Sequence, residues 1–138
     1  MIEKMQILVK LMEIQYQRDR LALQSIIKDE LRIREELMTL QEHTRLARLL
    51  GLDDEPEMRA MGADVVWERW LERSRVSLNL KLATVLATKE MHLTRVRKSF
   101  GKLQAANAKS EQILLATKKR MKVKNLEQAI SHSISQNQ

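Results

Sequence analysis

The sequence predicts an all-α protein, a long two-helix antiparallel coiled-coil hairpin with a short helical turn at the connection. Three observations support this fold class. Aromatic residues make up only 3% of the 138 residues, and three glycines and one proline leave too few turn residues for a sheet protein. Good helix formers dominate the composition. Apolar residues also recur at alternating steps of three and four, which is the coiled-coil period.

The first helix is expected at about residues 2–50. Its seam is apolar at most positions: Met5, Val9, Met12, Tyr16, Leu23, Ile26, Ile33, Leu37, Leu40 and Ala47. Asp19, Glu30 and Thr44 occupy the remaining seam positions. A flanking row widens the stripe and leaves apolar surface for a further partner: Leu8, Ile27, Leu31 and Met38.

The connection is expected at about residues 51–63. Gly51 follows the periodic stretch and is the expected end of the first helix. The only proline, Pro56, suits the first turn of a short helix at about residues 56–61. Asp64 is a suitable N-cap for the second long helix.

The second helix is expected at about residues 64–126, so that the hairpin covers residues 1–126 and a frayed polar tail covers 127–138. Its best seam is Leu82, Leu86, Leu93, Val96, Phe100, Leu103, Leu114 and Met121. Polar residues occupy the positions between them: Lys89, Asn107, Ser110 and Thr117. Gly101 lies inside this helix, where glycine costs about 1 kcal/mol relative to alanine.

The net charge of +7 is distributed unevenly along the chain. Residues 1–72 contain 11 Lys and Arg against 15 Asp and Glu, whereas residues 73–138 contain 14 against 3. An acidic first helix beside a basic second helix favours antiparallel pairing within the chain. The excess of positive charge in the second half also favours an acidic partner.

The densest positive stretch is Lys118 to Lys124, which permits several interpretations. Cations near a helix C-terminus interact favourably with the helix dipole and keep that end soluble. Nucleic-acid binding is disfavoured because stacking aromatics and a recognisable module are missing nearby. Direct membrane binding is disfavoured because few large apolar residues accompany the cations. An acidic protein partner is the remaining interpretation.

Sites for catalysis are not found in the sequence. The chain has no cysteine, and its isolated glycines do not form a phosphate-binding loop. His43, His92 and His132 lack partners at metal-ligand spacing. We therefore expect no enzyme, no catalytic or metal site, no cofactor and no small-molecule substrate. The lack of cysteine favours the cytoplasm as the location. No segment is long and apolar enough for a signal peptide or a membrane span.

Trp67 and Trp70 are two of the four aromatic residues and lie near the start of the second helix. They suit either packing at the connected end of the hairpin or docking to a partner, because tryptophan is enriched at interface hot spots. The sequence leaves both interpretations open.

Two stretches, together with the two-helix pattern, carry a resemblance to a known family. They are Ala63-Asp64-Val65-Val66-Trp67-Glu68-Arg69-Trp70-Leu71 and Arg97-Lys98-Ser99-Phe100-Gly101-Lys102. The chain resembles the FliJ family of flagellar export proteins and the related stalk proteins of virulence type III secretion. The resemblance covers nearly the whole chain in architecture, but Gly101 inside a long helix has no explanation in it.

The resemblance implies a central-stalk or adaptor protein at the export apparatus. Such proteins bind the export ATPase hexamer with the paired chain ends, meet the cytoplasmic ring of the export gate near the turn, and in some members handle export chaperones. The implied ATPase-binding residues are Met5, Met12, Leu114, Lys118, Lys119, Arg120, Lys122 and Lys124. The implied residues for docking to the gate or another partner are Met38, Trp67, Trp70 and Leu71. Contact with the membrane is expected to be indirect. The alternatives are a homodimeric coiled-coil scaffold and a basic nucleic-acid-associated coiled coil.

Overall fold

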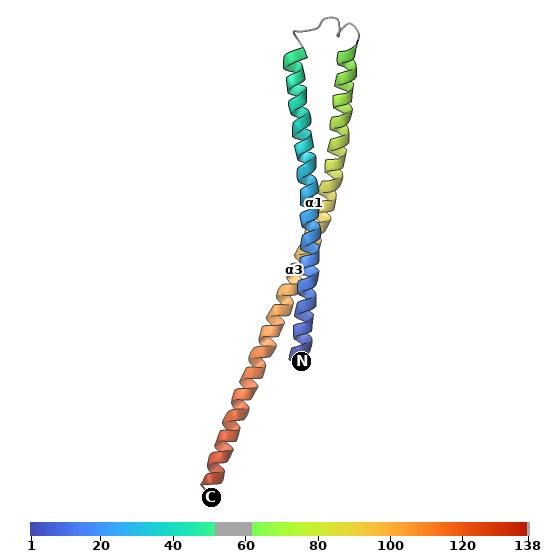
Figure 1. Cartoon of the computed structure of the whole chain (residues 1–138). Helices are drawn as coiled ribbons and strands as arrows, with labels where there is room; N and C mark the ends of the chain where they lie inside the picture. The colour runs from blue at the N-terminus through green and yellow to red at the C-terminus, as the bar shows by residue number, and fades with distance from the viewer. Residues whose placement is uncertain (52–61, 138) are drawn as a thin grey trace. The chain divides into compact units, whose positions relative to one another are not determined.

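The protein consists of two long helices, seen in a computed structural model that describes residues 1–51 and 62–137. Helix α1 spans Ile2–Gly51 and helix α3 spans Ala63–Gln136 (Figure 1). The two helices pack against each other, and the described residues contain no strand, which confirms the predicted all-α two-helix hairpin. The connection and the short helix predicted at residues 56–61 lie outside the described residues.

The chain divides into two units, and both helices contribute to each. Unit 1 comprises Met1–Asp19 and Arg95–Gln138, and unit 2 comprises Arg20–Thr94. Each unit therefore has its own pair of helical segments and its own seam, and each is described separately below.

The seam of α1 lies where the sequence predicts it. The predicted apolar positions from Met5 to Ala47 are all buried or half-buried, and so are the polar positions Asp19, Glu30 and Thr44. Ile33 is the most buried apolar residue among those described, with 5% of its surface exposed. The alternating spacing of three and four continues along α1 without a break, which is why the seam was predictable from the sequence.

The seam of α3 consists of two rows of residues, each repeating every seven residues, and the sequence predicts only one of these rows correctly. One row is confirmed, because its members are buried or half-buried: Leu82, Lys89, Val96, Leu103, Ser110 and Thr117. The other row is displaced by one residue, and its buried or half-buried members are Val85, His92, Ser99, Ala106 and Ile113. Of the predicted residues in this row, Leu93 is half-buried as expected. Leu86, Phe100, Asn107, Leu114 and Met121 are exposed, so the assignment of these five to the seam is wrong. Small residues such as Ser99 and Ala106 allow close approach of two helices, whereas the larger residues beside them flank the contact.

The ends of α3 differ from those expected. The predicted N-cap, Asp64, lies inside the helix, and the carbonyl oxygen of Gly62 accepts a backbone hydrogen bond from Val66 at 3.1 Å. Gly62 has a φ of 75°, which glycine adopts without steric cost. At the other end, α3 continues to Gln136, past the expected end at residue 126, so the predicted frayed tail is helical up to that residue.

The two helices are not a pair of opposite charge. Within its bounds α1 contains nine Lys and Arg and eight Asp and Glu, whereas α3 contains 15 and six. The predicted acidic character of the first helix is therefore wrong, because the excess acidic residues follow it in the chain. Of the ion pairs between described residues, only Glu30–Lys89 joins α1 to α3. Apolar seam contacts, rather than charge, hold the pair together.

Candidate functional site

The helical segments of unit 1 are joined by a polar contact inside the seam. Ser99 has only 2% of its surface exposed, and its hydroxyl group is hydrogen-bonded to the carboxylate of Asp19. The same hydroxyl also lies 2.8 Å from the carbonyl oxygen of Arg95, one turn earlier in α3. Next to this contact the rings of Tyr16 and Phe100 pack at 5.6 Å between centroids. These contacts fix which residues of the two segments lie opposite each other.

The register of unit 1 determines where α1 stops covering α3. Because the segments are antiparallel and Asp19 lies opposite Ser99, Ile2 lies opposite the region of Ala116. Burial agrees with this register, since Thr117 is the last half-buried residue of α3. Every described residue from 118 to 137 is exposed. We call residues 118–137 the terminal segment; its helical part extends about 30 Å beyond the cover of α1, at about 1.5 Å per residue.

The terminal segment begins with five exposed cations, which we call the basic collar: Lys118, Lys119, Arg120, Lys122 and Lys124. Lys118 and Lys122 are four residues apart and share one face of the helix. Arg120 and Lys124 share the opposite face, because two residues correspond to about 200° around a helix. Among the ion pairs of the described residues, none involves the collar. The collar therefore presents positive charge on opposite sides of an uncovered helix.

The excess charge of the whole protein belongs to unit 1. This unit contains 13 Lys and Arg against five Asp and Glu, whereas unit 2 contains 12 against 13. Unit 1 therefore attracts acidic partners over a distance of about one Debye length, roughly 8 Å at physiological salt. Unit 2 is nearly neutral and does not contribute to this attraction.

The residues implied for ATPase binding do not all lie on a free surface. Leu114 and the collar residues are exposed, but Met5 and Met12 are half-buried in the seam of unit 1. The two methionines therefore pack between the helices, and only the exposed part of each side chain is available to a partner. The exposed set is concentrated on α3.

The two tryptophans of unit 2 pack against each other on α3. Their ring planes are 18° apart and their centroids are 5.1 Å apart. Trp67 keeps 44% and Trp70 keeps 52% of its surface exposed. Met38, on α1, is also exposed, whereas Leu71 is buried in the seam and does not present its side chain to a partner. The tryptophan pair thus offers an exposed aromatic surface of the kind found at interface hot spots.

Unit 2 has a polar contact inside its seam as well. The ammonium group of Lys89, on α3, lies 2.9 Å from the carboxylate of Glu30, and Arg34 lies 3.1 Å from the same carboxylate. The hydrogen bond from Lys89 is the main cause that lowers the pKa of Glu30, with a smaller contribution from Arg34, while burial acts in the opposite direction. The carboxylate is therefore held in its charged form between the two helices.

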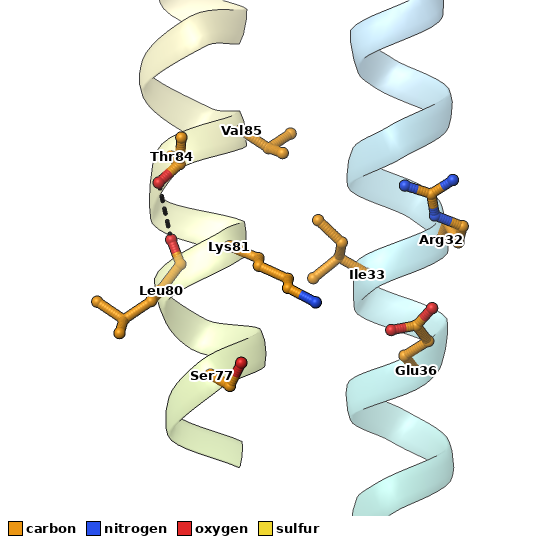
Figure 2. Close-up of a pocket in the computed structure, with 8 residues that line it drawn as sticks. All are labelled: Arg32, Ile33, Glu36, Ser77, Leu80, Lys81, Thr84 and Val85. Carbon is orange, nitrogen blue, oxygen red and sulfur yellow. Dashed lines mark hydrogen bonds between the residues drawn. The ribbon is translucent and has the colours of Figure 1, made fainter. Parts of the chain in front are cut away.

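A hollow lies between the helices of unit 2 and is lined by both (Figure 2). Its lining residues are Arg32, Ile33, Glu36, Ser77, Leu80, Lys81, Thr84 and Val85. Figure 2 shows Ile33 and Lys81 directed toward each other across the gap, whereas Leu80 points away from α1. In this region the seam of α3 takes two consecutive steps of four, from Ser74 through Leu78 to Leu82, instead of alternating steps. Such an extra step of four changes the local winding of a coiled coil, which accounts for the looser contact here.

The described residues contain no arrangement typical of a metal site. Within residues 1–51 and 62–137, no group of three or more His, Asp or Glu side chains is close enough to hold an ion. The sequence-derived candidates His43 and His132 are exposed, and His92 is half-buried in the seam. Neither helix, within the described ranges, has a stretch that is both long and apolar enough to cross a membrane.

Sequence reasoning missed two features of unit 1. It did not place Ser99 and Ala106 in the seam, because the strongly apolar Phe100 and Leu114 suggested a row displaced by one residue. It also ended the helix before Ile130 and Ile134, which the structure places on a continuous exposed helix.

Comparisons with known proteins add no relative, because no family model, no curated protein and no solved structure matches the chain.

Proposed function

We propose that the chain is a central-stalk or adaptor protein of a flagellar or type III secretion export apparatus, which binds the export ATPase hexamer and links it to the export gate. The observation that carries the proposal is the basic collar on an uncovered helix. A flat partner such as a nucleic-acid duplex or a membrane surface contacts cations on one side of a helix. A ring contacts them on all sides, so a collar with cations on opposite faces suits an acidic channel.

The seam contacts support a role that transmits movement between two partners. In each unit a polar contact within the seam, Asp19–Ser99 or Glu30–Lys89, fixes the alignment of the two helical segments. The exposed tryptophan pair of unit 2 is the proposed contact with the cytoplasmic ring of the export gate. Export chaperones are further proposed partners, and a cytoplasmic location at the secretion apparatus is part of the same proposal.

The proposal is tested with the purified chain and the export ATPase, by measuring ATP hydrolysis and binding. The double variants Lys118→Gln/Lys122→Gln and Arg120→Gln/Lys124→Gln each remove two cations from one face of the collar. If a ring surrounds the helix, each variant weakens binding on the order of tenfold at physiological salt. A matched control, Lys102→Gln/Lys109→Gln, removes two exposed cations elsewhere in unit 1 and is expected to have a much smaller effect.

The result also distinguishes the proposal from its alternatives. A chain that neither binds the ATPase nor changes its turnover contradicts the proposal. Loss of binding in only one of the two collar variants indicates a one-sided partner, and retention on DNA that falls steeply with salt indicates a nucleic-acid-associated protein. For the gate contact, Trp67→Ala/Trp70→Ala is expected to lower binding to the gate ring without lowering binding to the ATPase.

A second candidate function, a homodimeric coiled-coil scaffold, is favoured by one observation in unit 1. Ile7, Leu11 and Ile14 are exposed and follow steps of four and three, on the face of α1 opposite its seam. This second apolar stripe is typical of a helix that packs against two neighbours. Light scattering of the purified chain tests the candidate, because a scaffold of this kind has the mass of a dimer.

A further inference from the structure

The terminal segment carries a second recognition element beyond the basic collar, namely an apolar stripe. It consists of Val123, Leu126, Ile130 and Ile134, which follow one another at steps of three, four and four. This spacing places the four side chains on one face of an α-helix. All four are exposed, although aliphatic side chains of this size gain stability by burial.

Three of the four stripe residues lie off the line of the seam inside the chain. Alternating steps of three and four from Thr117, the last half-buried residue, lead to Arg120, Lys124, Glu127 and Ser131, all polar, and reach the apolar Ile134 only at the fifth step. Val123, Leu126 and Ile130 each precede one of these positions by one residue, so they are turned by about 100° from the line of the seam. In the register of unit 1, Ile2 lies opposite the region of Ala116, so the residues of α1 do not contact them. None of the described residues therefore covers the stripe, and it is available to a partner.

We infer that this stripe binds in an apolar groove rimmed by carboxylates on the acidic channel of the export ATPase, while the collar binds the rim. The inference rests on the proposed function and names the contact that supplies affinity. Apolar anchors at steps of three and four are the pattern by which an amphipathic helix occupies a groove. Charge complementarity identifies the occupant as acidic, because unit 1 has 13 cations and five anions and the collar lies directly before the stripe.

Two other occupants fit the charges less well. A second copy of the chain has its own unit 1, which carries the same excess of positive charge. The collars of the two copies therefore repel each other. In a membrane surface, the cations of an interfacial helix lie away from its apolar face. Here Lys119 precedes Val123 by four residues and lies on the same face as the stripe. A groove with acidic residues at its rim accommodates that lysine, whereas an acyl-chain layer does not.

The test compares the stripe with the opposite face of the same helix. The variant Leu126→Gln/Ile130→Gln removes two anchors and keeps a good helix former at both positions. Met121→Gln is the matched control, because Met121 is as exposed as Leu126, at 60% and 62%, and lies on the far side of the helix. Circular dichroism is expected to show unchanged helix content and Tm for both variants, since none of these side chains is buried.

Binding to the export ATPase is then measured at two salt concentrations. The stripe variant is expected to raise Kd by roughly 10- to 100-fold with an unchanged salt dependence, whereas Met121→Gln changes Kd less than about threefold. The collar variants differ, because they reduce the salt dependence itself. If the stripe variant binds like the wild type, the inference is overturned and the proposed function stands. If the wild-type chain does not bind the ATPase, both are overturned.

The same proteins are sedimented with vesicles that contain anionic phosphatidylglycerol. The inference expects the wild-type chain and the stripe variant to associate with the vesicles equally weakly. Sedimentation of the wild type that the stripe variant loses, together with equal ATPase binding by the two proteins, identifies a lipid surface as the occupant and overturns the inference.

Discussion

Ile33 offers a direct measure of how much the seam stabilises the helix pair. Its side chain is 95% removed from solvent, whereas Leu31, two residues earlier in α1, is 55% exposed. Truncation to alanine removes three carbon atoms in either case. At about 0.8 kcal/mol per buried carbon, Ile33→Ala loses about 2.4 kcal/mol and Leu31→Ala loses about 1 kcal/mol. The higher helix propensity of alanine returns a few tenths of a kcal/mol in both variants.

The expected net losses are therefore about 2 kcal/mol for Ile33→Ala and under about 1 kcal/mol for Leu31→Ala. A larger cavity penalty is not expected, because Ile33 borders a hollow whose other lining residues include the exposed side chains of Arg32, Glu36 and Lys81. Urea unfolding followed by circular dichroism at 222 nm measures both values, and the corresponding decrease in Tm for Ile33→Ala is roughly 6–10 °C. Equal losses in the two variants, or a larger loss for Leu31→Ala, refute the assignment of Ile33 to the seam.

Two further predictions concern the polar contacts of the seams. Because Lys89 lowers the pKa of Glu30 in the folded protein, the contribution of this carboxylate to stability is complete above its ordinary pKa of 4.5 and is lost as the pH falls below that value. The difference in Tm between the wild type and Glu30→Gln is thus expected to shrink on acidification below pH 4.5; a difference that stays constant contradicts the ion pair. In unit 1, Ser99→Ala leaves the half-buried carboxylate of Asp19 without its hydroxyl donor, so the free energy of unfolding is expected to fall by about 1 kcal/mol. The matched variant Ser133→Ala, at an exposed position of α3, is expected to change it by less than about 0.5 kcal/mol, and similar values for the two variants would argue against the contact.

The sequence predicts α1 well because its pattern is continuous. Polar residues such as Asp19 and Glu30 occupy seam positions, yet enough apolar positions on either side keep the period unambiguous. The fold explains why Asp19 and Glu30 occupy seam positions, because each is hydrogen-bonded to a residue of α3 that is far away in the sequence.

The seam of α3 was harder to predict because hydrophobicity and packing favour different residues there. Phe100 and Leu114 are strongly apolar and suggest one row, but Ser99 and Ala106 occupy it because they are small and because Asp19 pairs with Ser99. A buried hydroxyl group in a seam is stabilised by a hydrogen-bond partner on the other helix. Such a pairing leaves no periodic signal in a single sequence.

The candidate site was predictable in its charge but not in its exposure. The cluster of cations from Lys118 to Lys124 is visible in the sequence, whereas the absence of cover by α1 follows from the register. Counting charge by halves of the chain also assigned acidic residues of the connection to the first helix. The apolar stripe beyond Leu126 was missed because Ser, Gln and Asn residues suggested a frayed end, although Ile130 and Ile134 continue the helical spacing.

The polar contacts inside the seams have a mechanical consequence. A heptad repeat alone permits two helices to slide past each other by seven residues, about 10 Å, and still match apolar positions. A slip of this kind toward the C-terminus of α3 moves Asp19 from Ser99 to the methyl group of Ala106, and in unit 2 it separates Glu30 from Lys89. Each displacement leaves a carboxylate without its partner, so the seams resist shear as well as separation. A force applied along one helix is thereby transmitted to the other through one polar contact in each unit, Asp19–Ser99 and Glu30–Lys89.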